Sequence, residues 1–201
     1  MPRPALTEEQ RQQIRRNIRQ AAADLYAENG MANISARQIA QAAGVSVGTL
    51  YGYFSNLTEL MQSLWKQPVS RLIRDFEAQL AAIEDPYQRL RTFMTSYVEF
   101  ATGQRQLYRG AFMYVRPESH DKPTPVPLKD DRFFALLHGA VSDAQAQGLI
   151  RSGDTQALAQ TIWAGLHGAI SLPLNLDRLA LDPPEVAASR MIDTLLEWLQ
   201  P

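Results

Sequence analysis

Hydrophobic residues recur three or four positions apart along almost the whole chain, which is the spacing of one face of an α-helix. The first such stretch begins at a capping pair, Thr7 and Gln10, and continues to Asn29. No segment alternates hydrophobic and polar residues between turn signals, as a half-buried strand would. The pattern therefore predicts an all-α fold.

Residues 35–54 predict two short helices joined by a tight turn. Ser35 is a favourable N-cap for a helix over residues 36–43, and Gly44 can adopt the left-handed conformation that ends it. Ser46 then caps the second helix. Two short helices joined by a three-residue turn that begins with glycine form a helix-turn-helix.

The outward face of the second short helix suits the major groove of DNA. The hydroxyl and methyl groups of Thr49 can meet base edges, and tyrosine hydroxyls can reach phosphates. Each glycine in this helix costs about 1 kcal/mol, which indicates a close approach of the backbone to DNA. The alternative is a short helical hairpin buried within some other all-α protein. The outward face of the second helix would then be an ordinary solvated surface, and it carries few charged residues for such a surface. The predicted DNA-binding residues are Ser35, Arg37, Ser46, Val47, Gly48, Thr49, Tyr51, Gly52 and Tyr53.

Residues 39–60 read IAQAAGVSVGTLYGYFSNLTEL and resemble the DNA-binding pattern of TetR-type transcriptional regulators. The resemblance spans both short helices, the turn and the start of the next helix. It implies an N-terminal helix-turn-helix domain, placed at residues 1–55, and a C-terminal helical regulatory and dimerisation domain over residues 56–201. Val47 and Leu57 stand where many relatives carry lysine, which bears on DNA affinity rather than on fold.

The rest of the chain predicts six more helices, for a total of about nine. Because a proline disfavours helical backbone in the preceding residue, a kink or break is expected at Gln67, before Pro68. Residues 116–128 contain four prolines and are expected to form a long surface loop. The remaining helices are predicted to begin near Asn56, Asp85, Gln104, Lys129, Asp154 and Pro183.

The last two helices carry more apolar surface than one small domain would be expected to cover. Paired across a twofold axis, they would form a four-helix interface, and the dimer would present two recognition helices to pseudo-palindromic double-stranded DNA. The TetR resemblance implies the same homodimer. The predicted interface residues are Ala169, Leu172, Ile192, Leu195, Leu196 and Leu199.

Aromatic residues follow the helical spacing in the middle of the C-terminal region, a pattern typical of a core as well as of a ligand site. The TetR resemblance implies a cavity there for a small apolar or aromatic effector. Residues 163–168, WAGLHG, also resemble the Trp-His-Gly segment of one TetR subgroup. Trp163 and His167 lie one turn apart and line either the cavity or the dimer seam. The predicted pocket residues are Phe93, Tyr97, Phe112, Met113, Phe134, Trp163 and His167.

Composition excludes several kinds of chemistry. The chain of 201 residues has no cysteine, so it has neither disulfides nor thiolate metal sites. Its three histidines are too far apart in sequence for a local metal motif, and we predict no metal and no cofactor. The first twenty residues are polar and no long apolar run occurs, which predicts a cytoplasmic protein without a membrane segment.

Charge is distributed unevenly, although the formal net charge is only −1. Residues 1–66 hold seven Lys or Arg against five Asp or Glu, and the rest of the chain holds thirteen against sixteen. The N-terminal part is therefore slightly basic and the remainder slightly acidic, as a modest DNA-binding face on an acidic body would be.

Residues 44–48, GVSVG, match the G-x-S-x-G nucleophile elbow of α/β-hydrolases. The elbow requires a strand before the serine, whereas an Ala-rich helix is predicted there. Ser46 is therefore assigned as an N-cap or phosphate contact, and no enzymatic activity is expected. We predict a TetR-type repressor that a small apolar or aromatic ligand releases from its operator. The alternative, suggested by Val47, Gly52 and Leu57, is a helical ligand-binding or protein-interaction module with weakened DNA binding.

Overall fold

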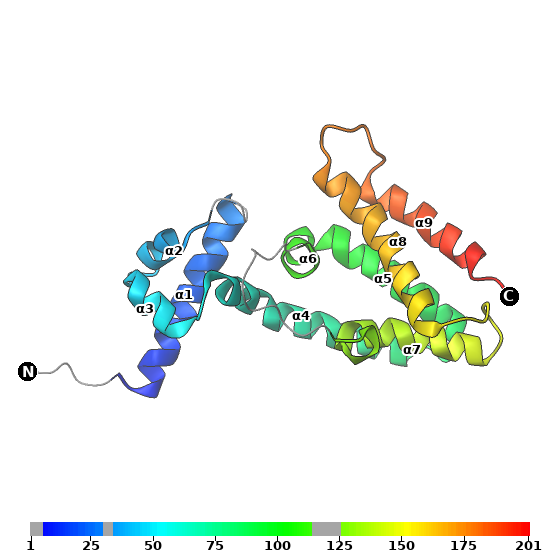
Figure 1. Ribbon diagram of the computed structural model, residues 1–201, viewed down its shortest axis with the longest axis horizontal. Coiled ribbons are helices and arrows are strands. Elements are labelled where there is room, and N and C mark those ends of the chain that lie inside the picture. Colours follow the sequence, from blue (N-terminus) through cyan, green and yellow to red (C-terminus); the bar gives the residue numbers. More distant parts are fainter. Residues whose placement is uncertain (1–5, 30–33, 114–125) are drawn as a thin grey trace, which may run out of the picture. The chain divides into compact units, whose positions relative to one another are not determined.

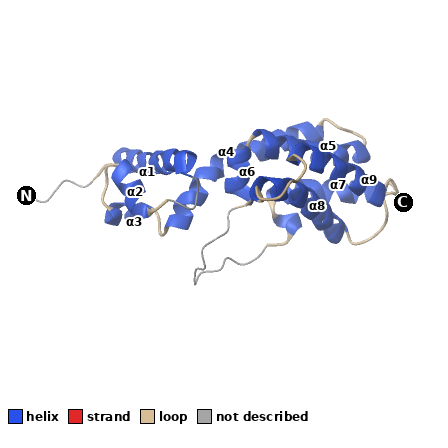
Figure 2. Cartoon of the chain, turned by 90° about the horizontal axis from the view of Figure 1, so that it is seen from above, coloured by secondary structure: helices blue, strands red, loops and turns tan. Residues whose placement is uncertain are grey.

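The computed structural model describes residues 6–29, 34–113 and 126–201. Over these ranges the chain forms nine α-helices, one short 3-10 helix and no strand (Figure 1, Figure 2), which confirms the all-α fold. The α-helices are α1 (Glu8–Asn29), α2 (Ala36–Ala42), α3 (Val47–Tyr53), α4 (Leu57–Ala81), α5 (Pro86–Gly103), α6 (Arg105–Phe112), α7 (Arg132–Ala146), α8 (Thr155–Asn175) and α9 (Pro184–Trp198).

The helices form two compact units. The first contains α1, α2, α3 and the beginning of α4 as far as Val69, and the second contains the described residues from Ser70 onward. The contacts within the chain thus group residues 57–69 of α4 with the first unit. The predicted domain division between residues 55 and 56 stays a prediction.

The first unit is built around one apolar core to which all four of its helices contribute. Ile18 of α1, Ile39 of α2 and Leu50 of α3 are fully buried, as is Leu60 of α4. Leu57, at the start of α4, is half-buried against the same core. An apolar residue at position 57 therefore has a packing role, which a lysine there would not fill.

Helix α4 continues without interruption from Leu57 to Ala81, and Pro68 lies inside it. The expected break near Gln67 was therefore wrong, and the alternative of a kink there stays a prediction. Pro68 is exposed, so its ring does not disrupt any packing, and the helix loses one backbone donor at this point. The division between the two compact units falls directly after this proline, between Val69 and Ser70.

The second unit has an aromatic core and a close contact between α8 and α9. Phe76 of α4, Phe93 of α5 and Phe133 of α7 are buried, with ring centroids 5.5–5.7 Å apart. A Cβ atom on Gly165 would lie 3.1 Å from the sulfur of Met191. The small residue in α8 therefore allows α9 to approach closely.

Some predicted boundaries differ from those in the structure, and others fall outside it. The helix expected from Lys129 is preceded by a 3-10 turn over Leu128–Asp130, and α7 begins only at Arg132. The reason is Asp131, whose carboxylate accepts the N–H groups of Phe133 and Phe134 as an N-cap. Most of the loop expected at 116–128 lies outside the described residues.

No helix in the described part of the chain combines the length and apolarity needed to cross a lipid bilayer. Within the same ranges, no group of three or more His, Cys, Asp or Glu side chains is placed to hold a metal ion.

Candidate nucleic-acid interface and effector region

Local hydrogen bonds fix both ends of the helix-turn-helix. The Ser35 hydroxyl accepts the Gln38 backbone N–H, and the Gln38 side chain accepts the Ser35 N–H, which completes a capping box at the start of α2. Gly44 ends the helix with φ of 68°, in the left-handed region. Ser46 caps α3 by accepting the Thr49 N–H. These sequence predictions are confirmed.

Ser46 is the serine of the G-x-S-x-G match, and its surroundings differ from those of a nucleophile elbow. Helix α2 precedes it rather than a strand, and its hydroxyl lies 2.8 Å from the Thr49 hydroxyl. The chain has no histidine before His120, so the first unit supplies no general base of that type. The local structure is therefore that of a helix cap and not of a nucleophile elbow.

The face of α3 expected to meet DNA is exposed. Val47 is 38% exposed and Tyr51 47% exposed, although both are large apolar or aromatic side chains. Thr49 and Arg37 are also exposed, whereas Tyr53 is half-buried and packs against the core of the first unit. Eight of the nine predicted DNA-binding residues are thus exposed on α2, α3 or their caps. Their contact with DNA stays a prediction.

No contact with the described residues requires glycine at the two positions in α3. A Cβ atom on Gly52 would meet no atom within 4 Å, and one on Gly48 would meet only the Ser46 hydroxyl at 3.7 Å. Neither residue has a positive φ. Glycine weakens a helix by about 1 kcal/mol relative to alanine, and no described contact offsets this cost. The close approach of DNA expected from the sequence stays a prediction.

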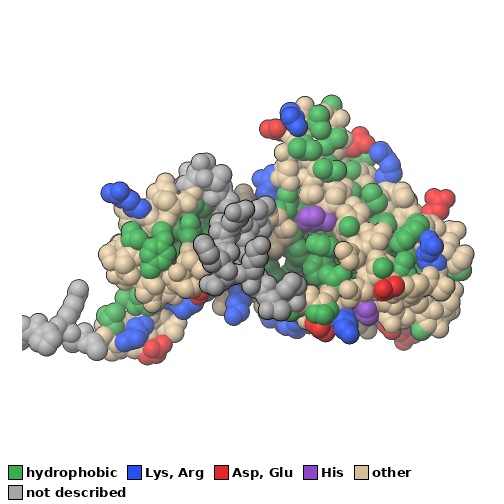
Figure 3. All heavy atoms as spheres, viewed as in Figure 1, with side chains coloured by type: hydrophobic (Ala, Val, Ile, Leu, Met, Phe, Trp, Pro, Cys, Tyr) green, Lys and Arg blue, Asp and Glu red, His purple; other side chains and the backbone are tan. Residues whose placement is uncertain are grey.

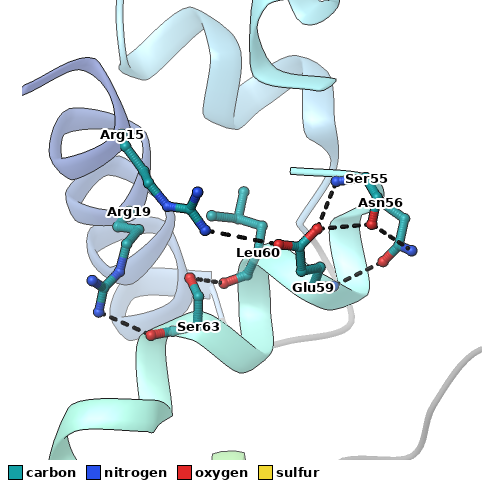
Figure 4. A network of polar contacts seen from close by, with 7 residues as sticks. All are labelled: Arg15, Arg19, Ser55, Asn56, Glu59, Leu60 and Ser63. Atoms are coloured by element: carbon teal, nitrogen blue, oxygen red, sulfur yellow. Dashed lines mark hydrogen bonds and ion pairs between the residues drawn. The ribbon is translucent and has the colours of Figure 1, made fainter. Parts of the chain in front are cut away.

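A polar brace, consisting of Arg15, Ser55 and Glu59, joins α1 to the α3–α4 junction (Figure 4). Glu59 accepts hydrogen bonds at 2.7 Å from both the backbone N–H and the hydroxyl of Ser55. The Arg15 guanidinium lies 3.8 Å from the Glu59 carboxylate and 4.6 Å above the Phe54 ring. The Ser55 hydrogen bonds, followed by the charge of Arg15, lower the pKa of Glu59. The brace holds the end of the recognition helix against α1 and α4.

Arg19 makes a second connection between α1 and α4, by donating to the Ser63 carbonyl at 2.9 Å (Figure 4). Arg15 and Arg19 thus bind groups of their own unit, while Arg11 and Arg16 are exposed. On the face drawn in Figure 3, hydrophobic and uncharged side chains cover much of the first unit, with few Lys or Arg.

Six of the seven residues predicted to line a ligand pocket are linked by ring contacts in the second unit, directly or through Phe133, whereas no described contact links Met113 to them. Phe93 and Tyr97 of α5 are fully buried, whereas the other members are half-buried. The Trp163 ring lies 4.6 Å from that of Phe134 and 5.2 Å from that of His167. The half-buried members are Phe112, Met113, Phe134, Trp163 and His167. Their arrangement is an aromatic cluster with a buried side and an accessible side, and its role in ligand binding stays a prediction.

A chain of polar atoms lies inside this aromatic cluster. The Tyr97 and Tyr108 hydroxyl oxygens lie 3.0 and 2.9 Å from Nδ1 of His167. Nε1–H of Trp163 donates to the Tyr97 oxygen at 3.2 Å. We call these four side chains the tyrosine–histidine node. The polar atoms of Trp163 and His167 thus contact buried residues of α5 and α6, and whether the two rings line a ligand cavity or the dimer seam stays open.

Burial shifts the pKa values of the two tyrosines and the histidine of the node. Desolvation raises the pKa of the Tyr97 hydroxyl far above its usual range, and it raises that of Tyr108 to about 12. The same cause lowers the pKa of His167. The surroundings therefore favour the neutral form of all three groups. Tyr108 was not among the predicted pocket residues, and its membership of the aromatic stripe was the only signal in the sequence.

Four of the six predicted dimer-interface side chains are already covered within one chain. Ile192, Leu195, Leu196 and Leu199 are at most 7% exposed. The argument that the last helices carry apolar surface that the chain cannot cover does not hold for these residues. Leu172 is 53% exposed and Ala169 is half-buried. The dimer interface stays a prediction, and it rests on the exposed part of α8.

Comparison with family models covers both units. The model described as bacterial regulatory proteins, tetR family, matches residues 18–64. The model described as tetracyclin repressor-like, C-terminal domain, matches residues 90–195, which is more than half of the chain.

Individual relatives agree with these matches. The fatty acid metabolism regulator protein of Bacillus subtilis (strain 168) is 23% identical over 152 residues, which are 75% of this chain and 78% of that protein. The HTH-type transcriptional regulator HbdR of Aromatoleum sp. (strain CIB) is 24% identical over 184 residues, 89% of this chain and 76% of that protein. The crystal structure of Bacillus subtilis FadR in complex with stearoyl-CoA has a TM-score of 0.63 at 20% identity, over 92% of this chain and 99% of that one.

Proposed function

The chain belongs to the TetR family of bacterial transcriptional regulators, and we propose that it acts as a cytoplasmic repressor that a small, largely apolar ligand releases from its operator. The observation that carries the DNA-binding part is the face of α3. It is exposed, it includes apolar and aromatic side chains, and it holds two glycines that no contact with the described part of the chain requires. A groove-facing surface accounts for all three features.

The ligand-responsive part is supported by the aromatic cluster of the second unit. Its half-buried side offers aromatic faces, and its polar atoms are few and confined to the tyrosine–histidine node. Such a surface suits a mainly apolar molecule that needs one or two hydrogen bonds for orientation. A FadR protein of similar fold was crystallised with stearoyl-CoA, which makes long-chain acyl-CoA thioesters the first compounds to test.

Helix α4 supports a route from ligand to DNA. It is one continuous helix that contributes residues to both compact units. A ligand that favours one position of α4 over another would change the placement of α3, because the hydrogen bonds from Ser55 to Glu59 tie the end of α3 to the start of α4. By linkage, operator DNA would weaken ligand binding by the same factor. A homodimer would place two such recognition helices on one pseudo-palindromic site.

Gly52→Ala tests the DNA-binding surface. The substitution adds one methyl group to the exposed face of α3, where it meets nothing in the chain, and strengthens the helix by about 1 kcal/mol. We expect it to weaken binding to a duplex selected from a random pool by at least about tenfold, because the methyl group keeps the backbone from the groove. Fluorescence anisotropy measures the dissociation constant.

Gly139→Ala is the matched control. It also lies in a helix, and its Cβ atom would also meet nothing within 4 Å, but it belongs to the second unit. It should stabilise the protein without changing duplex affinity. Equal affinity of Gly52→Ala and the unaltered protein would contradict the proposed surface. Negligible binding of the unaltered protein to any duplex at low salt would favour a helical ligand-binding module instead.

A further inference from the structure

We infer that the tyrosine–histidine node binds an uncharged carbonyl oxygen of the effector, whose apolar remainder lies against the aromatic side chains around it. The inference rests on the proposed function, because it specifies the chemical class of that effector. The class comprises ketones, esters, amides and thioesters of largely apolar molecules.

The first argument is a count of hydrogen-bond donors and acceptors at Nδ1 of His167. A neutral imidazole carries a hydrogen on one nitrogen and a single lone pair on the other. When Nδ1 has the lone pair, it can accept from Tyr97 or Tyr108 but not fully from both, although both hydroxyls lie within 3.0 Å. When Nδ1 has the hydrogen, it donates to one hydroxyl, and both hydroxyl hydrogens then need other acceptors.

Trp163 makes this excess of donors larger. Its indole N–H already occupies one acceptor position on the Tyr97 oxygen. In another arrangement, Tyr108 donates to the Tyr97 oxygen and Tyr97 donates to Nδ1. The ring hydrogen of His167 is then on Nε2, and Nε2–H is the remaining donor. No acceptor for Nε2–H occurs among the residues that the structure describes. Every neutral arrangement therefore leaves at least one donor without an acceptor among the described residues. In the arrangement that satisfies both hydroxyls, this donor is Nε2–H on the half-buried ring of His167, which is not among the buried atoms without a partner, so a ligand oxygen can reach it.

The second argument concerns charge. The side chains around the node are aromatic, and Arg109, next to Tyr108 in sequence, donates to the Leu174 carbonyl at 2.7 Å. Burial lowers the pKa of His167, so this ring supplies no positive charge at neutral pH. A carboxylate placed here would be desolvated without a counter-charge from the described residues, which is costly. An uncharged carbonyl accepts the same hydrogen bond without that penalty.

The third argument is access. Tyr97 and Tyr108 are fully buried, but the ring of His167 is half-buried, as are those of Trp163 and Phe112. The ring of Phe112 is stacked with that of Tyr108, at 6.1 Å and 27°. A ligand that contacts the half-buried rings therefore lies beside the buried hydroxyls. The node is thus placed where it can orient a ligand rather than enclosed in a closed core.

The test uses three small probes of similar size: acetophenone, ethylbenzene and benzoate. They carry, in turn, a neutral carbonyl, no acceptor and a charged acceptor. Binding to the full chain is followed by nuclear magnetic resonance, through the ring nitrogens of His167 and the indole N–H of Trp163. We expect acetophenone to shift both signals and to bind about tenfold more tightly than ethylbenzene, with benzoate no tighter than ethylbenzene.

Tyr108→Phe removes one hydroxyl and keeps the ring. We expect this variant to weaken the preference for acetophenone rather than abolish it, because it leaves Nε2–H of His167 as the remaining free donor of the node. Its affinity for ethylbenzene should stay the same. Tyr87→Phe is the control, because Tyr87 is a half-buried tyrosine at the start of α5 that is not part of the node. Its preference for acetophenone should be that of the unaltered protein.

Three results would overturn the inference: equal affinity for acetophenone and ethylbenzene, tighter binding of benzoate, or no response of the Trp163 and His167 signals to any probe. An undiminished preference for acetophenone in Tyr108→Phe would overturn the role of this hydroxyl as well. Duplex binding is measured on the same samples. Failure of the unaltered protein to bind any duplex would contradict the proposed function. The probe results test only whether the node binds an uncharged carbonyl oxygen.

Discussion

At the scale of single residues, the hydroxyl groups of Tyr97 and Tyr108 are expected to contribute differently to the stability of the folded protein. The Tyr97 oxygen accepts the Trp163 indole N–H, whereas the Tyr108 hydroxyl competes for Nδ1 of His167. We expect Tyr97→Phe to lower the free energy of unfolding by about 1–2 kcal/mol, because it leaves that N–H unpaired. Tyr108→Phe should change it by less than about 0.5 kcal/mol, because it removes a surplus donor. Urea denaturation of both variants measures the difference, and an equal loss in both would contradict it.

The titration of Tyr108 provides a second prediction at this scale. Burial raises its pKa from 10.0 to about 12 in the folded protein. A raised pKa means that folding favours the protonated form, so this contribution to stability is complete below pH 10 and is lost as the pH rises toward 12. Tyr108→Phe should therefore lose less stability than the unaltered protein over that range. Thermal melting at several alkaline pH values tests this, with Tyr87→Phe as the control that should not differ.

At the scale of elements, the junction of α3 and α4 depends on one carboxylate. Ser55 and Arg15 lower the pKa of Glu59, so its contribution to stability is present above the ordinary pKa of 4.5 and is lost as the pH falls. Glu59→Gln should weaken the first unit at neutral pH, by less than about 1 kcal/mol because the side chain is 43% exposed. At acidic pH, where Glu59 is protonated, the first unit should be equally stable in the variant and in the unaltered protein.

The control for this effect is Glu28→Gln, an exposed carboxylate on α1 of the same unit. It should follow the unaltered protein at every pH. Amide hydrogen exchange in α3 and at the start of α4 reports on the first unit directly. A difference between Glu59→Gln and the unaltered protein that persists undiminished at low pH would show that the carboxylate charge is not what stabilises the junction.

Helix α4 allows a prediction about the point where the two units divide. Pro68 lacks an N–H group, so the Leu64 carbonyl has no partner four residues ahead, although the helix continues. Pro68 is exposed, and Pro68→Ala therefore restores a hydrogen bond without removing packing. We expect slower amide exchange over residues 64–72 in this variant. Pro173→Ala makes the same change in α8 and should leave exchange in α4 unaltered, whereas unchanged or faster exchange in Pro68→Ala would contradict the expectation.

At the scale of the whole molecule, the sequence predicted those features that depend on neighbours in the chain. The Ser35 and Ser46 caps and the left-handed Gly44 involve residues at most three positions apart, and periodicity located the helices around them. The Glu59–Arg15 pair joins residues 44 positions apart in the chain. The node joins Tyr97 to His167 across 70 positions. Hydrophobic periodicity specifies which face of a helix is buried but not which polar atoms meet inside, so neither contact could be predicted.

The predicted dimer interface also concerns the whole molecule. Because the predicted interface residues of α9 are buried within one chain, the exposed part of α8 is left to form that interface. Leu172 is 53% exposed, so Leu172→Glu removes little packing within the chain and introduces a charge where a second copy would lie. We expect the variant to keep its helical content and melting temperature, to sediment as a monomer, and to bind a selected palindromic duplex with a shallower salt dependence, because one recognition helix replaces two. Leu149→Glu places the same charge on another exposed leucine, between α7 and α8, and should remain dimeric. Sedimentation at several concentrations decides the question: a Leu172→Glu protein that still forms dimers would place the interface elsewhere than on this part of α8.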